Sequence, residues 1–417
     1  MAADGKSAVD RPRPLDGVLV VDMAGPFGAY ASRLLADLGA DVTRVVPSDG
    51  DPLSAEWPVV DTPGGEQSAF EWFVNIDKDL LALDLDQEAG WAQLAALLDR
   101  ADVLVESWGM DPRAWAYQDR AELAARLPRL TIVSVTPFGI HGPRSADAGT
   151  DLIALAAGGL LALGGYKDTE PIATHGQARL AASIFGAAAA IFGLIGREQD
   201  GRGRLLDVAA QEVVAAALED AIPQFDLTGT VRRRAGDSPR EAGTGIYRCA
   251  DGYVSMVAGR LGTAKAWRSL VAWLDESGVE GAEILVEEEW NSFAHRQKPE
   301  SVKTFIEVFE RFTGRYTKAE LYEAAQARDI ALAPVNEIPE VLADPQLAAR
   351  DFFVPLDVSD LGRPVLVPGR PYRLTDESPF LPYLSRVDGH DAQHASKPEQ
   401  EELADARPAW TGAPARP

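Results

Sequence analysis

One stretch, Val133–Val208, decides the fold of this chain. It reads VSVTPFGIHGPRSADAGTDLIALAAGGLLALGGYKDTEPIATHGQARLAASIFGAAAAIFGLIGREQDGRGRLLDV. The β-branched, apolar run Ile132–Val135 predicts a buried strand, and Gly and Pro residues then interrupt it. Two apolar runs of small residues follow, Asp151–Leu163 and Leu180–Ile195, and both are long enough to form buried helices. A strand, a polar loop and a helix start in this order mark the place where α/β proteins carry ligand chemistry.

The chain before this stretch alternates between strand and helix patterns. This order predicts a parallel sheet that is covered by helices. The predicted strands are Gly17–Asp22, Asp41–Val46, Phe73–Ile76, Leu80–Leu85 and Ala101–Glu106, and the predicted helices are Glu88–Arg100 and Arg120–Ala125. Residues 48–68 contain three Pro and three Gly and predict one long loop. The turn after the first strand lacks the pattern G-x-G-x-x-G, so no dinucleotide fingerprint is present.

Composition changes along the chain predict its domain organisation. We expect residues 1–14 to be a disordered arm and residues 381–417 to be a solvated tail. Residues 15–220 and 331–380 should form a large α/β domain, and residues 225–330 a smaller one.

Charge and composition exclude several classes of function. The 417 residues carry a formal net charge of −24, which argues against nucleic acid or an anionic membrane as a partner. A single cysteine, Cys249, excludes a disulfide framework, and five scattered histidines make a metal site unexpected. The N-terminus has no apolar signal-peptide core, and no uninterrupted apolar run is long enough to span a membrane. We therefore expect a cytoplasmic protein.

Several short blocks resemble one family when they are taken together and in order. They are LLADLGADV (34–42), KDLLALDL (78–85), ADVLVES (101–107), GPRSADAGTDLIALAAGG (142–159), DGRGRLLDVAA (200–210), YRCADGYV (247–254) and APVNEIPEVLADPQLAARDFF (333–353). The chain is similar to the class III CoA-transferases, the carnitine and bile-acid (CaiB/BaiF) type. The resemblance implies a Rossmann-like large domain, a smaller α+β domain and an interlocked, ring-like dimer. It also implies a coenzyme A thioester as substrate, a carboxylic acid as acceptor and no tightly bound cofactor.

The resemblance breaks at the residue that should carry the chemistry. Members of the family attack the thioester with an Asp that lies shortly before the helix leading into the GRGRLLD block. Counting back from Gly201 without gaps places that position at Ala178, and the neighbouring residues Gly176–Leu180 contain no carboxylate. Alanine cannot carry a covalent intermediate. The fallback nucleophile is Asp151, although a first-turn acid of a helix is the simpler interpretation of that residue.

The family's contacts to coenzyme A transfer to few positions. The resemblance implies Arg44, Lys78, Trp108 and Thr150 as ligand-binding residues. Asp79 beside Lys78 weakens a phosphate site, Arg44 is equally well explained as a strand-end surface residue, and Trp108 as a core residue. Related racemases have a His where this chain has Thr150, so racemase chemistry is disfavoured.

Two loops offer further candidates. His141 lies in a Gly-rich loop, and the segment Arg232–Arg240 contains four arginines that would suit a loop closing over a ligand. For each of them a solvated surface position is the alternative interpretation.

Three functions are compatible with these features of the sequence. The first is a subunit of a heteromeric CoA-transferase that lacks the nucleophile and pairs with a homologous, Asp-bearing chain. The family includes such two-subunit enzymes for benzylsuccinate-like dicarboxylic acids. The second is a self-sufficient CoA-transferase that uses a displaced carboxylate, and the third is a non-catalytic acyl-CoA-binding or scaffold protein.

Overall fold

The computed structural model describes residues 13–107, 120–166, 168–172, 174–234, 241–260, 262–358, 361–373 and 386–387. The chain divides into two compact units, and each is described by itself. The first unit contains the described parts of Met1–Leu161, Ala173–Thr230 and Ala348–Pro417. The second contains those of Ala162–Ile172 and Val231–Leu347.

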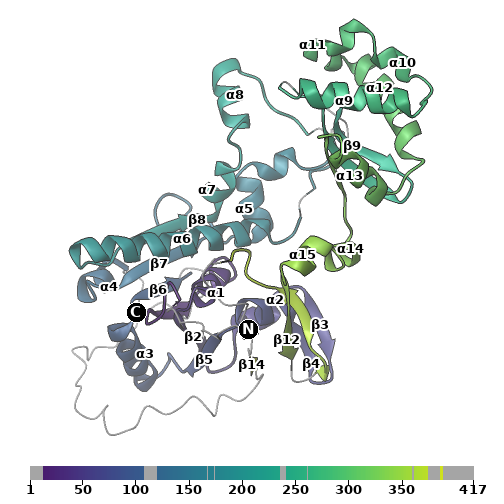
Figure 1. The fold of residues 1–417 in the computed structure, drawn as a ribbon. Coiled ribbons are helices and arrows are strands. Elements are labelled where there is room, and N and C mark those ends of the chain that lie inside the picture. Colours follow the sequence, from purple (N-terminus) through teal and green to yellow (C-terminus); the bar gives the residue numbers. More distant parts are fainter. Residues whose placement is uncertain are drawn as a thin grey trace, which may run out of the picture. The chain divides into compact units, whose positions relative to one another are not determined.

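A six-stranded sheet forms the centre of the first unit, with the order β5-β2-β1-β6-β7-β8 (Figure 1). Every neighbouring pair in it is parallel. The strands are β1 (Leu19–Met23), β2 (Asp41–Pro47), β5 (Lys78–Leu83), β6 (Val103–Glu106), β7 (Thr131–Thr136) and β8 (Leu205–Ala209). The predicted parallel α/β sheet is therefore confirmed.

Helices cover both faces of this sheet. Successive residues of a strand point to opposite faces, so Val20 packs into one apolar cluster and Val21 into another. The first cluster is completed by α1 (Ala29–Asp37), α5 (Asp151–Ala157), α6 (Gln177–Asp200) and α7 (Ala210–Ala216), and the second by α3 (Glu88–Arg100) and α4 (Arg120–Arg126). The helix α8 (Ala221–Thr228) follows α7 in the chain.

Helix α6 packs unusually close to strand β7 because its contact face carries glycines. A Cβ atom on Gly186 would lie 2.9 Å from Val135 Cγ2, and one on Gly193 would lie 2.4 Å from Thr131 Cγ2. Among the described residues α6 is also the one helix long and apolar enough to cross a membrane by length and composition alone. More than half of its most apolar window is buried inside the protein, as in a core helix.

The structure corrects two local predictions. The predicted strand Phe73–Ile76 overlaps the end of a helix, α2 (Ala69–Val74), whose first turn is capped by Ser68. The predicted loop 48–68 contains a 3-10 turn, η1 (Pro52–Ala55), and a hairpin of β3 (Val59–Thr62) and β4 (Gly65–Ser68). Few apolar residues alternate in this hairpin, so the periodicity of its sequence is weak. A small sheet of β12 (Phe353–Val358), β13 (Val365–Pro368) and β14 (Arg386–Val387) completes the first unit.

The second unit combines an antiparallel sheet, β11-β10-β9, with a group of helices. The strands are β9 (Thr244–Cys249), β10 (Gly252–Val257) and β11 (Ala331–Pro334). The helices are α9 (Ala264–Glu276), α10 (Ala282–Leu285), η4 (Glu288–Asn291), α11 (Phe293–Arg296), α12 (Pro299–Thr313), α13 (Lys318–Gln326) and α14 (Ile338–Leu342), and α15 (Pro345–Ala349) leads back to the first unit.

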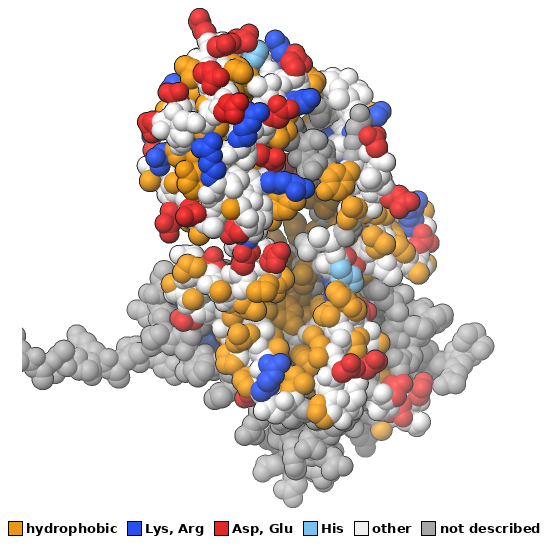
Figure 2. Space-filling view, turned by 90° about the vertical axis from the view of Figure 1, so that its right-hand side faces the viewer, with side chains coloured by type: hydrophobic (Ala, Val, Ile, Leu, Met, Phe, Trp, Pro, Cys, Tyr) orange, Lys and Arg blue, Asp and Glu red, His pale blue; other side chains and the backbone are white. Residues whose placement is uncertain are grey.

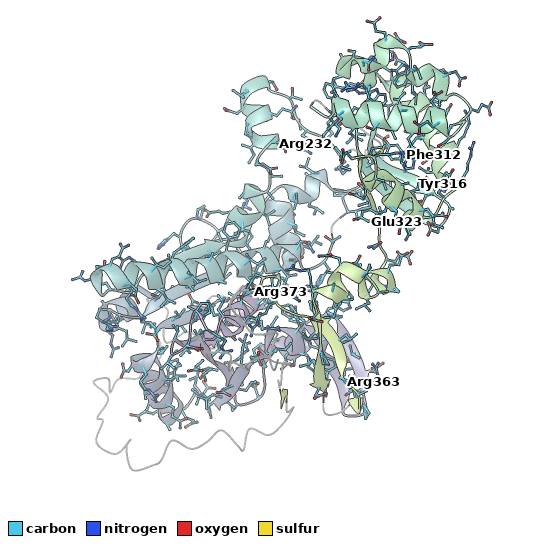
Figure 3. The ribbon with its side chains drawn as sticks, viewed as in Figure 1. Arg232, Phe312, Tyr316, Glu323, Arg363 and Arg373 are labelled. Carbon is cyan, nitrogen blue, oxygen red and sulfur yellow. The ribbon has the colours of Figure 1, made fainter. Side chains whose placement is uncertain are left out.

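Aromatic side chains build the core of the second unit. Figure 3 labels two of them, Phe312 and Tyr316, whose ring centroids are 5.1 Å apart. The ring of Trp273 meets Phe312 edge-on at 4.8 Å. On the face of this unit that Figure 2 shows, acidic and basic side chains are interspersed rather than separated by sign. That face therefore offers no continuous basic surface.

The unit boundaries differ from the predicted ones at two places. Residues 331–347 belong to the second unit, because β11 pairs with β10 there, so the chain returns to the first unit at Ala348 and not at residue 331. Residues 162–172 also belong to the second unit. The guanidinium of Arg234 donates hydrogen bonds to three of their backbone carbonyls, those of Ala162, Tyr166 and Thr169.

Candidate functional site

The sheet order creates a switch point between β1 and β6. From β1 the chain adds β2 and β5 on one side and β6, β7 and β8 on the other. Open α/β sheets bind ligands at such a point, outside the carboxyl ends of the strands. Here the turn Ala24–Gly28 follows β1, and Ser107 follows β6.

The turn Ala24–Gly28 is held in place by its neighbours. Ser183 on α6 donates a hydrogen bond of 2.8 Å to the carbonyl of Phe27. A Cβ atom on Gly28 would lie 2.8 Å from the Cβ of Ala24, so glycine is required at this close approach. Ser107 donates to the carbonyl of Val135 at 2.7 Å, which ties the end of β6 to β7.

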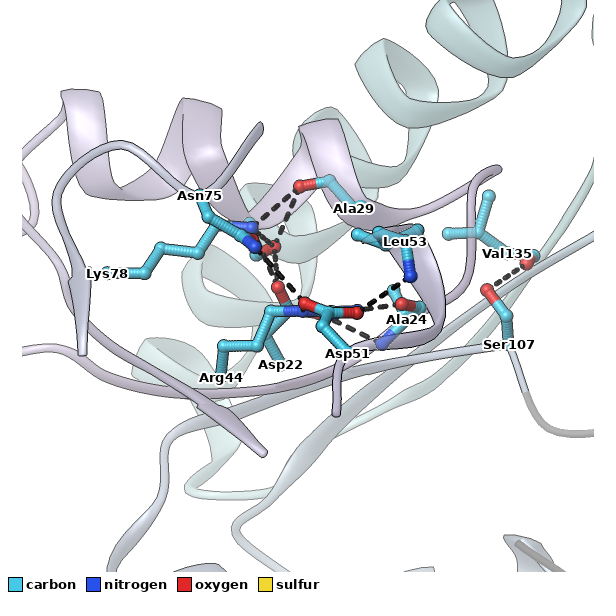
Figure 4. A network of polar contacts seen from close by, with 11 residues as sticks. Asp22, Ala24, Ala29, Arg44, Asp51, Leu53, Asn75, Lys78, Ser107 and Val135 are labelled. Atoms are coloured by element: carbon cyan, nitrogen blue, oxygen red, sulfur yellow. Dashed lines mark hydrogen bonds and ion pairs between the residues drawn. The ribbon is translucent and has the colours of Figure 1, made fainter. Parts of the chain in front are cut away.

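A buried network of four charges lies beside this turn (Figure 4). Asp22 at the end of β1 faces Arg44 on β2 in the sheet register, and Arg44 Nη1 lies 3.1 Å from Asp22 Oδ1. The other two nitrogens of Arg44 donate to Asp51 at 2.7 and 2.8 Å. The ammonium of Lys78 lies 2.7 Å from Asp22 Oδ2. Two cations thus balance two carboxylates inside the protein.

Backbone and side-chain hydrogen bonds complete the network. Lys78 Nζ also donates to the carbonyl of Ala29 and to Ser32 Oγ, both at 2.9 Å. Asp51 accepts from the backbone N–H of Leu53 at 2.9 Å and from the side-chain amide of Asn75 at 3.1 Å. The four charged groups are thereby paired, as a buried ion cluster needs to persist, while the side-chain oxygen of Asn75 is buried without a hydrogen-bond partner.

The network shifts the pKa values of its members. Burial alone would raise the pKa of Asp22, but the charges of Lys78 and Arg44 outweigh it and hold that pKa below its usual value. Burial lowers the pKa of Lys78 to about 8, against the opposing effect of Asp22. Burial and the charge of Asp51 raise the pKa of the neighbouring Glu71 to about 7.

The ligand-binding residues implied by the family lie in three different settings. Arg44 is 2% exposed and the side chain of Lys78 is fully buried, so both cations already have carboxylates of this chain as partners. Their contact to coenzyme A stays a prediction, and it would require those carboxylates to be displaced. Thr150 is exposed at the start of α5 and makes no capping hydrogen bond. Trp108 lies outside the described residues.

The position that the resemblance assigns to the nucleophile, Ala178, lies in the first turn of α6, and the fallback acid Asp151 begins the neighbouring helix α5. Ala178 is fully buried among apolar neighbours of the large core. The carboxylate of Asp151 accepts hydrogen bonds from the backbone N–H groups of Gly176 and Arg179, at 2.8 and 2.9 Å. Asp151 therefore caps α6 from the start of the neighbouring helix α5, and both of its oxygens are engaged.

Arg179 joins the start of α6 to the segment after η1. Its guanidinium donates to the carboxylate of Glu56 at 3.0 Å and to the carbonyl of Trp57 at 3.2 Å. The same group lies 3.8 Å above the ring of Phe70 on α2. The indole of Trp57 meets the ring of His175 edge-on, with centroids 5.0 Å apart.

The loop between β7 and α5 is fixed by the last residue of the GRGRLLD block. Both oxygens of Asp207 accept from the backbone N–H of Ile140 at 3.1 Å. His141, which follows, is exposed, in keeping with a solvated loop position.

Sequence patterns missed several residues of this site. Asp51 precedes Pro52 and accepts a hydrogen bond from the backbone N–H of Leu53. A helix-cap pattern in the sequence could therefore have identified Asp51 as a capping residue. No sequence signal connects Arg179 with Glu56, because the two residues are 123 positions apart. Within the described part of the chain no group of three His, Cys, Asp or Glu is placed to hold a metal ion. The expectation of no metal stays a prediction.

Matches to known proteins cover most of the chain. The family model described as CoA-transferase family III matches residues 15–382. The subunit BbsE of the succinyl-CoA:(R)-benzylsuccinate CoA-transferase of Thauera aromatica is 38% identical over 359 residues, which cover 85% of this chain and 86% of the relative.

More distant relatives agree with that match. The succinate–glutarate CoA-transferase of Agrobacterium fabrum is 27% identical over 386 residues, covering 89% of this chain and 94% of the relative. A crystal structure of a CAIB/BAIF family protein from Brucella suis superposes with a TM-score of 0.70 and 25% identity, covering 87% of this chain and 97% of the other.

Proposed function

The chain belongs to CoA-transferase family III, and from this premise we propose that it is the non-nucleophilic subunit of a heteromeric CoA-transferase. The proposed reaction moves CoA from an acyl-CoA such as succinyl-CoA to a carboxylic acid. Because the relatives above are named for benzylsuccinate and glutarate, the acceptor we propose is a dicarboxylic acid. A homologous, Asp-bearing chain would supply the nucleophile.

The observation that supports this proposal is that the start of α6 offers no free carboxylate among the described residues. A covalent CoA-transfer step needs a carboxylate that is free to attack the thioester carbonyl. Residues 174–183 contain no acid, and Ala178 is packed in the core with none of its surface exposed. The two nearby acids, Asp151 and Glu56, are both bound, one to backbone N–H groups and the other to Arg179.

A displaced nucleophile at Asp151 is the main alternative, and its surroundings speak against it. Two backbone N–H donors stabilise a carboxylate and thereby reduce its nucleophilicity. Releasing Asp151 for attack would also remove the cap of a helix of 24 residues. Its position therefore suits a structural acid better than an attacking one.

A second feature supports a partner chain. Helix α6 is apolar on both sides, and its outer face exposes four large side chains, Ile184, Phe185, Phe192 and Ile195. Helices of this kind are normally covered. With Phe192 68% exposed, the four side chains present on the order of 400 Å² of apolar surface, about half of one side of a standard interface. No charged residue interrupts α6 between Arg179 and Arg197, so the occupant we propose is a second chain with a matching uncharged face.

The experiment that tests the function is reconstitution. We expect the chain to give no CoA transfer from succinyl-CoA to a dicarboxylic acid alone, and robust transfer when it is co-expressed with an Asp-bearing homologue. Replacing the partner's nucleophilic Asp with Ala should abolish the transfer, while Asp151→Asn in this chain should leave most of it. If Asp151→Asn abolishes transfer and the partner's substitution does not, the self-sufficient alternative replaces this proposal.

A scaffold or acyl-CoA-binding role makes a different prediction in the same experiment. A scaffold would form the complex without changing the turnover of the partner. A subunit of the enzyme should instead raise turnover well above that of the partner alone.

A further inference from the structure

We propose that Trp57 and His175 form an aromatic subsite that receives the aryl ring of an aryl-substituted dicarboxylic acid. The inference rests on the proposed function, because it names the class of acceptor that the same site would take. It concerns two side chains for which neither the network nor the fold provides a role.

The two rings are exposed although they are large and held together. Trp57 is 62% exposed, and His175 is exposed beside it, with an interplanar angle of 84° between the rings. An indole that stays in contact with water gives up the free energy that burial of its apolar surface would provide. An exposed aromatic ring offers the ring of a ligand a stacking position.

The backbone segment that carries Trp57 is also held in place by hydrogen bonds and ion pairs. The carbonyl of Trp57 accepts from Arg179, and the preceding Glu56 forms an ion pair with the same guanidinium. At the other end of the segment, Asp51 is bound to Arg44 in the buried network. A ring whose backbone is fixed at both ends loses little conformational freedom when a ligand binds.

The pair is close to the position that the resemblance assigns to the chemistry. His175 precedes Ala178 by three residues, and Arg179 connects Trp57 to the same first turn of α6. A ligand ring stacked on Trp57 would therefore lie near the start of α6.

Local charge favours an uncharged ring over the adenine end of coenzyme A. The adenine carries phosphates with it, and these need free cations. The guanidinium of Arg179 is already engaged by Glu56 and by the carbonyl of Trp57, and Asp151 adds a further negative charge at the helix start. The aryl ring itself brings no charge to this place, provided that the carboxylates of the acid point away from Glu56 and Asp151, so it is the better match.

Calorimetric titration of the full-length chain, repeated on its complex with the Asp-bearing partner, tests the subsite. The probes are benzylsuccinate, succinate and coenzyme A. We expect benzylsuccinate to bind more tightly than succinate. In Trp57→Ala, benzylsuccinate should lose roughly tenfold in affinity while succinate changes by less than about twofold. Trp57→Phe should keep most of the preference, because a ring remains.

Tyr322→Ala, which removes an exposed aromatic side chain from α13, is the matched control and should change nothing. Equal affinities for benzylsuccinate and succinate, or an unchanged ratio in Trp57→Ala, would overturn the proposal. A loss confined to coenzyme A would do so as well, because it would assign the rings to adenine. The titration measures binding without turnover, so it stands apart from a failure of the proposed heteromeric reaction.

Discussion

Replacing Asp51 with Asn tests whether the buried network holds the first unit together. The substitution keeps the shape of the side chain and removes its charge. Arg44 then keeps at most one of its two hydrogen bonds of 2.7 and 2.8 Å to this side chain, because an amide offers a single acceptor oxygen, and the three remaining charges no longer cancel. One uncompensated positive charge stays buried between Asp22, Arg44 and Lys78.

The expected cost follows from the burial of the pair. The side chains of Arg44 and Asp51 are 3% and 2% exposed, so water does not compensate the lost interaction. Breaking a buried pair of this kind costs about 3–5 kcal/mol in the free energy of unfolding. At about 2–4 °C per kcal/mol, that corresponds to a fall of ~6–20 °C in Tm. The charge of Asp51 helps to keep the pKa of Lys78 as high as about 8, so this pKa falls lower in the variant. The loss should therefore shrink as the pH rises toward about 8 and stay constant above it, where Lys78 is deprotonated in both proteins.

Denaturant unfolding followed by circular dichroism, at pH 7 and pH 9, measures this cost. Asp61→Asn is the matched control, since Asp61 is exposed on β3 and should be neutral within about 0.5 kcal/mol. If Asp51→Asn unfolds within about 1 kcal/mol of the control at pH 7, the network does not stabilise the fold as argued.

Three other substitutions test the remaining parts of the account. Glu71 has a pKa raised to about 7, so the folded state holds its proton more tightly than the unfolded chain, and stability falls as pH rises from about 4.5 to 7. Glu71→Gln should therefore be more stable than the wild type at pH 8 and lose that advantage at pH 4.5, as read from denaturant midpoints; an advantage that is independent of pH would contradict this. Asp151→Asn should cost about 1–2 kcal/mol, because it weakens the cap of α6, and an unchanged midpoint would refute that role. Phe192→Glu should prevent assembly with the partner chain on size exclusion, whereas Leu366→Glu, at an exposed position on β13, should not; assembly of both variants would remove α6 from the interface.

The sequence predicts the parts of the structure that depend on local patterns. The β-branched run at Ile132–Val135 and the small-residue runs that follow it do become β7, α5 and α6, since periodicity and glycine placement decide those elements. The first apolar run forms a shorter helix than predicted, because α5 ends at Ala157 before the glycine pair Gly158 and Gly159.

The site depends on contacts that local patterns do not contain. The interpretation of Arg44 as a surface or ligand-binding residue ignored the strand register, which sets Asp22 directly opposite it in a buried sheet. Arg179 and Glu56 meet only because α6 and the segment after β2 converge in the fold. The sequence predicts that Asp151 is a helix cap or a first-turn acid. It does lie in the first turn of α5, but its carboxylate caps the neighbouring helix α6.

The central claim is that this chain contains no group that carries the CoA-transfer intermediate. Trapping the enzyme-bound thioester during turnover of the reconstituted complex, followed by peptide mass spectrometry, locates that group directly. We predict an adduct on the Asp of the partner chain and none on any peptide of this chain. An adduct on the peptide that contains Asp151 would contradict the account and identify this chain as a nucleophilic subunit.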